Sequence, residues 1–185
     1  MKILMIIAKQ GFQDQEFQKP YDIFQEHNLI VDIASTEKGD CIGKFGLQVV
    51  ADRSLEDVDI EEYFAVVLIG GPGSVSLVGN PELEKIVQTA KEKNIVIAAI
   101  CYAPVILAKA EVLKGKKATV WNNDGKQGPI LEEAGVDFVD EMVVVDDMLV
   151  TANGPAAADA FGHAVVKAVE CSDCWIKETA DKRTD

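Results

Sequence analysis

The fold is decided by the stretch Ile95-Val96-Ile97-Ala98-Ala99-Ile100-Cys101-Tyr102-Ala103-Pro104-Val105-Ile106-Leu107. Its first half is an unbroken apolar run, which suits a strand that is covered on both faces and is too short for a buried helix. After Cys101 the apolar side chains recur at helical spacing instead. The change of period predicts a sharp strand-to-helix turn at Cys101.

A cysteine at such a turn has two possible roles. The turn would hold its side chain out at the edge of the sheet, often on a strained backbone, as in a nucleophile elbow. The following helix would present unpaired N–H groups and a positive dipole end, which favour a thiolate. Alternatively, Cys101 is a buried residue that behaves as a small hydrophobe. The local pattern alone leaves both roles open.

The rest of the chain predicts strands alternating with helices. Further strands are predicted at 2–7, 29–34, 65–69, 117–121, 138–139, 142–145 and 148–152, with an edge strand at 47–51 and a hairpin turn at Asp146-Asp147. Helices are predicted at 14–27, 54–57, 81–93, 129–134 and 156–169, with the regular part of the first starting late because of Pro20. Residues 8–13 and 36–46 are expected to be irregular. This order predicts an α/β fold, a mostly parallel sheet with helices on both faces.

Length and charge limit the function classes. The chain has 185 residues, of which 48% are hydrophobic, and we expect one domain over residues 1–175 and a polar tail over 176–185. A net charge of −13 without a basic cluster disfavours nucleic acid and anionic membranes as partners. No apolar run approaches the roughly 20 residues of a membrane span. Met1-Lys2 leads directly into an apolar run, so we expect no signal peptide. Four irregularly spaced cysteines are too few for a disulfide scaffold, so we expect a reducing, cytoplasmic location.

The four cysteines do not form a recognisable disulfide or metal pattern. Cys171 and Cys174 form a C-x-x-C at the end of a predicted helix, whereas a redox motif is expected at a strand–helix junction and a zinc site needs a second ligand pair. His163 is predicted to be a core residue and His27 a cation at a helix C-terminus. We therefore expect no metal site.

Ligands of parallel α/β sheets bind beyond the carboxyl ends of the strands. In this sequence that edge would bring together Gly11–Glu16, Gly70–Gly73, Cys101, Trp121 and Gly154-Pro155. The glycines of the Gly70-Gly71-Pro72-Gly73 turn would let the backbone approach another segment closely.

Three of these segments together resemble the ThiJ/PfpI superfamily. They are Gly11-Phe12-Gln13-Asp14-Gln15-Glu16, Gly70-Gly71-Pro72-Gly73 and Ala99-Ile100-Cys101-Tyr102-Ala103-Pro104, and the Asn153-Gly154-Pro155 turn extends the match. The resemblance covers nearly the whole chain. It implies a flavodoxin-like three-layer sandwich of the class I glutamine amidotransferase-like type, with a nucleophile elbow at Cys101.

The resemblance also implies residue roles. Cys101 matches the elbow cysteine, and Glu16 matches an acid that reaches its sulfur. Gly71 and Tyr102 match residues whose backbone N–H groups form an oxyanion hole, and Trp121 holds the place of a pocket-covering residue. A carboxyl group beside a sulfur anion should have a raised pKa and give its proton to the sulfur. Without the resemblance, Glu16 would be assigned to capping or solvating its helix, and Trp121 to the core or a dimer surface.

Three further residues, Gly70, Gly154 and Pro155, are expected to contact the substrate. One position departs from the family pattern: protease-like members have histidine directly after the cysteine, where this chain has Tyr102. Because a cysteine protease needs a general base, peptidase or amidase activity is disfavoured unless a neighbouring subunit supplies one. Many relatives are oligomers, so a homodimer is expected.

The leading functional hypothesis is a stress-related protein whose Cys101 thiolate adds to small reactive carbonyl compounds, in glyoxalase- or deglycase-like chemistry. One nucleophile and one acid/base suffice for this reaction, so no cofactor is expected. The alternative is a non-catalytic redox sensor, in which an oxidant converts Cys101 to sulfenic and then sulfinic acid.

Overall fold

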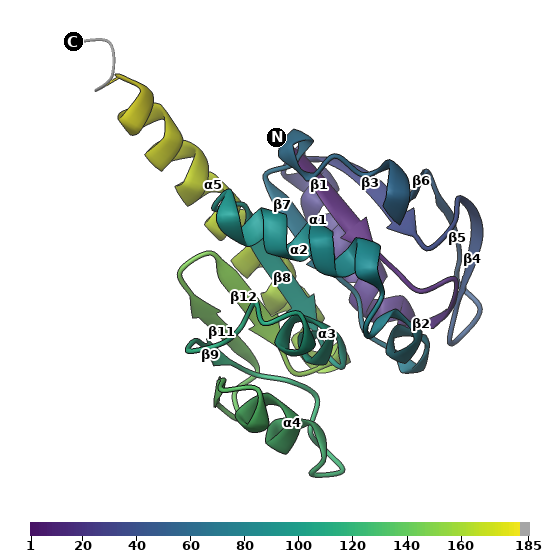
Figure 1. Ribbon diagram of the computed structural model, residues 1–185. Helices are drawn as coiled ribbons and strands as arrows, with labels where there is room; N and C mark the ends of the chain where they lie inside the picture. The colour runs from purple at the N-terminus through teal and green to yellow at the C-terminus, as the bar shows by residue number, and fades with distance from the viewer. Residues whose placement is uncertain (182–185) are drawn as a thin grey trace.

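A computed structural model describes the backbone of residues 1–181 and the side chains of residues 1–172. It shows a seven-stranded sheet with helices on both faces (Figure 1). The strand order is β11-β12-β8-β7-β1-β3-β6, and every neighbouring pair is parallel except β11 with β12. The predicted fold class is confirmed.

The bounds of the elements follow the predicted alternation. The strands are β1 Lys2–Ile6, β2 Gln10–Phe12, β3 Ile30–Ser35, β4 Gly39–Gly43, β5 Gln48–Ala51, β6 Arg53–Ser54, β7 Ala65–Leu68, β8 Val96–Ile100, β9 Lys117–Ala118, β10 Asp137–Phe138, β11 Val143–Asp146 and β12 Leu149–Ala152. The α-helices are α1 Asp14–Glu26, α2 Pro81–Glu92, α3 Ala103–Lys109, α4 Gln127–Glu133 and α5 Ala158–Asp181. Short 3₁₀ turns occupy Leu55–Asp57, Ile60–Glu62, Pro72–Leu77 and Pro155–Ala157.

Two hydrophobic layers hold the sheet between its helices. Because side chains alternate along a strand, Ile3 and Met5 of β1 point to one face, and Leu4 and Ile6 point to the other. The Ile3 face packs against α1 and α5, and the Leu4 face packs against α2 and α3. Apart from Lys2 at the start of β1, the central strands β1, β7 and β8 are apolar, because both of their faces are covered.

Three segments differ from their predicted structure. Residues 36–46 contain β4, which pairs with β2 and β5 in a separate three-stranded sheet, so two of the expected irregular regions contribute strands. The strand predicted at 117–121 is only β9, and it pairs with β10 rather than joining the main sheet. The short pairings depend on contacts between distant segments, which local periodicity does not reveal.

Helix α1 also differs at its start. It begins at Asp14 and runs through Pro20, with Gln13 as the N-cap residue. Proline lacks the N–H that would bond to the carbonyl of Glu16, which weakens the helix locally. The apolar side chains Phe17 and Phe24 are buried against the sheet, and this packing maintains the helix through the proline.

Helix α5 is longer than predicted. It continues past the expected end at Val169 to Asp181, and its C-terminal part runs beyond the sheet (Figure 1). The last residues of the predicted polar tail, 182–185, lie outside the described residues. None of the helices in the described part of the chain has the length and apolar character needed to cross a membrane.

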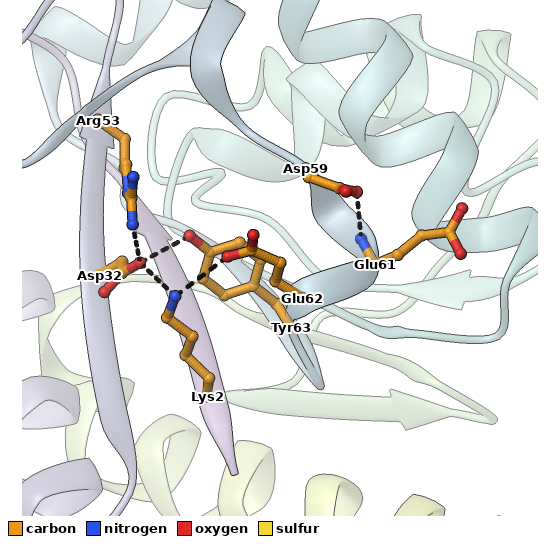
Figure 2. Close-up of polar contacts among 7 residues, drawn as sticks. All are labelled: Lys2, Asp32, Arg53, Asp59, Glu61, Glu62 and Tyr63. Atoms are coloured by element: carbon orange, nitrogen blue, oxygen red, sulfur yellow. Dashed lines mark hydrogen bonds and ion pairs between the residues drawn. The ribbon is translucent and has the colours of Figure 1, made fainter.

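A polar cluster lies near the amino ends of β1 and β7. The Asp32 carboxylate accepts a hydrogen bond from the Tyr63 hydroxyl at 2.8 Å and pairs with the Lys2 ammonium at 2.9 Å (Figure 2). Arg53 approaches the same oxygen at 3.5 Å, and Lys2 also reaches Glu62 at 3.2 Å. Burial raises the pKa of Asp32, but the hydrogen bonds from Lys2 and Tyr63 outweigh it, and the net shift is downward. The charged groups of this cluster are therefore paired with one another.

Candidate active site

Cys101 occupies a sharp turn between β8 and α3, as the sequence predicts. Its φ angle is +65°, in the left-handed region that a residue with a side chain rarely adopts. The surrounding backbone holds it there: its N–H donates to the carbonyl of Ala152 at 2.8 Å, and its carbonyl accepts from the N–H of Trp121 at 2.9 Å. The strained elbow is thus fixed by two neighbouring segments.

Glu16 is the acid of the site. It lies in the first turn of α1, its exposed fraction is 0%, and neither carboxyl oxygen has a hydrogen-bond partner of normal geometry. Gly70 explains how it comes so near the cysteine. A Cβ atom at Gly70 would lie 2.6 Å from the Cβ of Cys101 and 2.8 Å from Oε2 of Glu16. The missing side chain at position 70 therefore leaves the space in which acid and thiol meet.

The two groups affect each other's protonation. Burial raises the pKa of Glu16 to about 7, although the Cys101 thiol, the Gly70 N–H and the Lys44 charge each act to lower it. Burial, followed by the charge of the Glu16 carboxylate, raises the pKa of Cys101 to about 12. The N–H groups of Gly71 and Tyr102 face the sulfur and oppose this rise.

These shifts confirm the predicted direction for Glu16 and differ from the thiolate expected for Cys101. The sequence pattern indicates the helix N-terminus beside the sulfur but not the burial of that sulfur. The Glu16 carboxylate raises the pKa of Cys101 only while Glu16 is ionised. Above about pH 7 the pair therefore holds one proton and one negative charge between its two members, and it titrates as a unit.

The predicted close approach of the glycine turn is also present. The N–H of Gln13 donates to the carbonyl of Gly70 at 3.0 Å, which joins the segment after β1 to the turn after β7. Gly71 has a φ angle of +105°, and a Cβ atom there would lie 2.5 Å from the Gln13 nitrogen. Only glycine permits this contact, and the contact directs the Gly71 N–H at the sulfur.

A cavity of about 290 Å³ opens above the pair. Its lining residues are Gln13, Glu16, Lys44, Gly71, Pro72, Val75, Cys101, Tyr102, Trp121 and Pro155. A second hollow of about 250 Å³ lies beside Tyr63 and Lys93, but its lining contains no cysteine. Only the first combines a nucleophile with an unpartnered acid among the described residues, so it is the candidate active site.

Only some of the remaining residues that were expected to contact the substrate line the cavity. Trp121 and Pro155 line the cavity, whereas Gly70 lies behind the pair. Gly154 is not part of the lining, but a Cβ atom there would be 3.4 Å from Cδ1 of Trp121, so it borders the indole. Sequence reasoning missed Lys44 and Val75. Lys44 directly follows β4, inside a segment expected to be irregular, and no local pattern marks it.

The histidines lie away from the cavity lining. His163, expected in the core, has a side chain that is 57% exposed, because α5 turns it outward toward Asp159. Its ring lies 6.2 Å from the ring of His27, which is the C-cap residue of α1 as predicted. No group of three or more potential metal ligands occurs within the described residues.

The fold and the elbow cysteine opposed by a buried acid define a flavodoxin-like α/β protein of the ThiJ/PfpI type. The sequence model of the DJ-1/PfpI family matches residues 1–168. The chain belongs to this family.

Individual relatives agree with this assignment. An uncharacterized protein of Methanocaldococcus jannaschii is 41% identical, with 91% of this chain and 82% of the relative covered. A protein named deglycase from Pyrococcus horikoshii is 35% identical, with 90% of this chain and 98% of the relative covered. Among solved structures, a ThiJ/PfpI domain protein from Brachyspira murdochii superposes with a TM-score of 0.87 at 29% identity, covering 92% of this chain and 96% of the other.

Proposed function

We propose that the protein catalyses a deglycase- or glyoxalase-like reaction in which the Cys101 thiol adds to the aldehyde carbon of a small 2-oxoaldehyde or of its adducts. The main support is the buried Glu16 carboxyl, which has no hydrogen-bond partner of normal geometry and lies beside the thiol at the bottom of a cavity. An unpartnered buried acid is costly to the fold, which favours a functional role. The names of several relatives support the same chemistry.

The pair would move one proton through the reaction. As the sulfur–carbon bond forms, the thiol proton passes to the Glu16 carboxylate, whose raised pKa makes it a better base near neutral pH. Glu16 then protonates the former aldehyde oxygen to give a hemithioacetal. The N–H groups of Gly71 and Tyr102, which face the sulfur, would stabilise negative charge that develops beside it.

With methylglyoxal as substrate, the electrons then balance within the molecule. Glu16 removes the proton from C1, the C1 hydroxyl proton passes to the C2 oxygen, and the proton held by Glu16 returns to C2, so that C1 is oxidised and C2 is reduced. The resulting thioester is hydrolysed by water, which releases lactate and regenerates the thiol. No external oxidant or reductant is consumed.

The other two functions receive less support. Peroxide reacts with thiolates, and burial and Glu16 both raise the pKa of Cys101, which disfavours a fast redox sensor. A protease would need a base after the cysteine, and Tyr102 holds that position. The described histidines, His27 and His163, do not line the cavity.

Turnover of methylglyoxal by the purified protein tests the proposal. The wild type should convert methylglyoxal to lactate, and Cys101→Ala should lower kcat/KM by roughly 10³-fold or more, because the nucleophile is lost. Cys171→Ala is the matched control, since this free cysteine is exposed on α5 and does not line the cavity. Equal turnover by Cys101→Ala and the wild type, or none by either, would reject the proposal.

A further inference from the structure

The cavity wall carries one charged group that the proposed reaction does not use. Lys44 is the only basic residue in the lining, and Glu16 is the only acidic one. The ion pairs found among the described residues do not include Lys44. In a chain of net charge −13, an unneutralised ammonium at the cavity is a local exception.

The backbone of Lys44 is firmly placed. Its N–H donates to the carbonyl of Phe12 at 2.7 Å. The Asp14 carboxylate accepts from the N–H of Phe45 at 2.9 Å and from the N–H of Leu47 at 2.8 Å, which fixes the turn between β4 and β5. Because Asp14 begins α1 two residues before Glu16, the same short segment positions the turn of Lys44 and the acid of the pair.

The exposed side chain of Lys44 contacts an aromatic ring rather than an acidic group. Its ammonium lies 5.1 Å from the centroid of the Phe45 ring, a cation–π contact that leaves the charge available to a ligand. The positive charge of Lys44 also acts on the Glu16 carboxyl at the bottom of the cavity, where it is the smallest of the causes that lower the pKa of Glu16.

We propose that Lys44 is a specificity-determining residue, which favours carbonyl compounds bearing a carboxylate a few atoms from the reacting carbon over neutral compounds of the same size. This inference rests on the proposed function, since it assumes that the reacting carbon meets Cys101. The carboxylate would pair with the ammonium at the cavity wall while the carbonyl reaches the sulfur. A lysine acts here as a point charge, so no bidentate geometry is required.

Two alkylating reagents of nearly equal size provide the test. Iodoacetate is anionic and iodoacetamide is neutral, and each reacts at the Cys101 sulfur in the same way: the sulfur–carbon bond forms, iodide leaves, and the thiol proton passes to Glu16 and then to solvent. Mass spectrometry of the Cys101 peptide gives both rates. The measured quantity is the iodoacetate-to-iodoacetamide rate ratio in the wild type, Lys44→Gln and Lys85→Gln.

The ratio should fall by roughly three- to tenfold in Lys44→Gln, the range expected for one charge acting over several ångströms near a protein surface. Lys85→Gln is the matched control, because this exposed lysine on α2 does not line the cavity and its loss changes the net charge equally. Raising the salt concentration from roughly 0.05 to 0.5 M should lower the ratio in the wild type and leave Lys44→Gln nearly unchanged.

An unchanged ratio in Lys44→Gln would overturn the proposal. So would an equal slowing of both reagents, since that result would assign Lys44 to the protonation of the Cys101–Glu16 pair rather than to the ligand. Alkylation needs only a thiol in the cavity, so the result stands whether or not methylglyoxal is turned over.

Discussion

The two ends of the central sheet hold contrasting polar clusters. At the amino ends, Asp32 is surrounded by Lys2, Arg53 and Tyr63, and its carboxylate has a partner for its charge and its hydrogen bonds (Figure 2). At the carboxyl ends, Glu16 is fully buried, and neither of its oxygens has a hydrogen-bond partner of normal geometry. The surroundings lower the pKa of Asp32 and raise that of Glu16.

The difference separates an acid that stabilises the fold from an acid kept available for chemistry. A satisfied carboxylate is held in its charged form and gains nothing from accepting a proton. A buried, unpartnered carboxyl has a pKa near neutrality and can both accept and return a proton, at a cost to folding. Substituting each acid by its amide should therefore have opposite consequences.

The largest expected effect is on activity. Glu16→Gln should lower kcat for methylglyoxal by roughly 10²- to 10³-fold, because the amide cannot take the thiol proton. Asp32→Asn should leave kcat within about twofold of the wild type, since Asp32 lies toward the other end of the sheet and does not line the cavity. Steady-state kinetics of both variants make the measurement. Similar losses of kcat in the two variants would contradict the distinction between a catalytic and a structural acid.

The next effect concerns the space between the acid and the thiol. Gly70→Ala should destabilise the protein by roughly 1–3 kcal/mol and lower activity, because the added methyl group overlaps Cys101 and the Glu16 carboxyl. Gly125→Ala is the control: it has a φ angle of +73° in open space, so its cost is limited to the backbone. Urea unfolding and kinetics would be compared. Full activity in Gly70→Ala would contradict the close approach of Glu16 and Cys101 at Gly70.

Asp32→Asn and Glu16→Gln should have smaller effects on stability at pH 8, and these effects should be opposite in sign. Asp32→Asn should lower the free energy of unfolding by roughly 1–2 kcal/mol, since it weakens charge-assisted hydrogen bonds. Glu16→Gln should raise it by roughly 1–3 kcal/mol, since it removes a buried unpaired charge.

The stabilisation by Glu16→Gln should depend on pH. The folded carboxyl keeps its proton up to about pH 7, whereas the unfolded one, with a model value of 4.5, loses it earlier. Between these values the folded state binds more protons, so the free energy of unfolding of the wild type falls as pH rises. The advantage of Glu16→Gln should therefore be small at pH 4 and complete above pH 7. An equal advantage at both pH values would show that the charge is not its cause.

The fold and the centre of the site could be predicted because their signals are local. The apolar run of β8, the change of period at Cys101 and the glycine turn after β7 each follow from neighbouring residues. The parallel sheet then places the ends of its strands at one edge. The acid at position 16 required the family resemblance, since a glutamate in a first helical turn is equally suited to capping.

The remaining features depend on contacts between distant segments. The pairing of β4 with β2, which brings Lys44 to the cavity, has no local pattern in the sequence. Burial of the Cys101 sulfur is likewise a property of the assembled fold, and it reverses the pKa shift expected from the helix N-terminus alone. The core position predicted for His163 is wrong, because α5 turns this side chain outward although the nearby Phe161 and Val165 are buried.

The pH dependence of Cys101 alkylation by iodoacetamide, in the wild type and in Glu16→Gln, tests most directly whether thiol and acid share one proton. The reagent is neutral, so the rate follows the population of the ionised sulfur. In the wild type the rate should rise in two steps: to a low plateau with an apparent pKa near 7, where the pair loses its first proton and a fraction of the sulfur carries the charge, and again at about 12, where the second proton leaves. In Glu16→Gln it should rise only above the ordinary thiol range of about 8.5. Identical profiles for the two proteins would contradict the account.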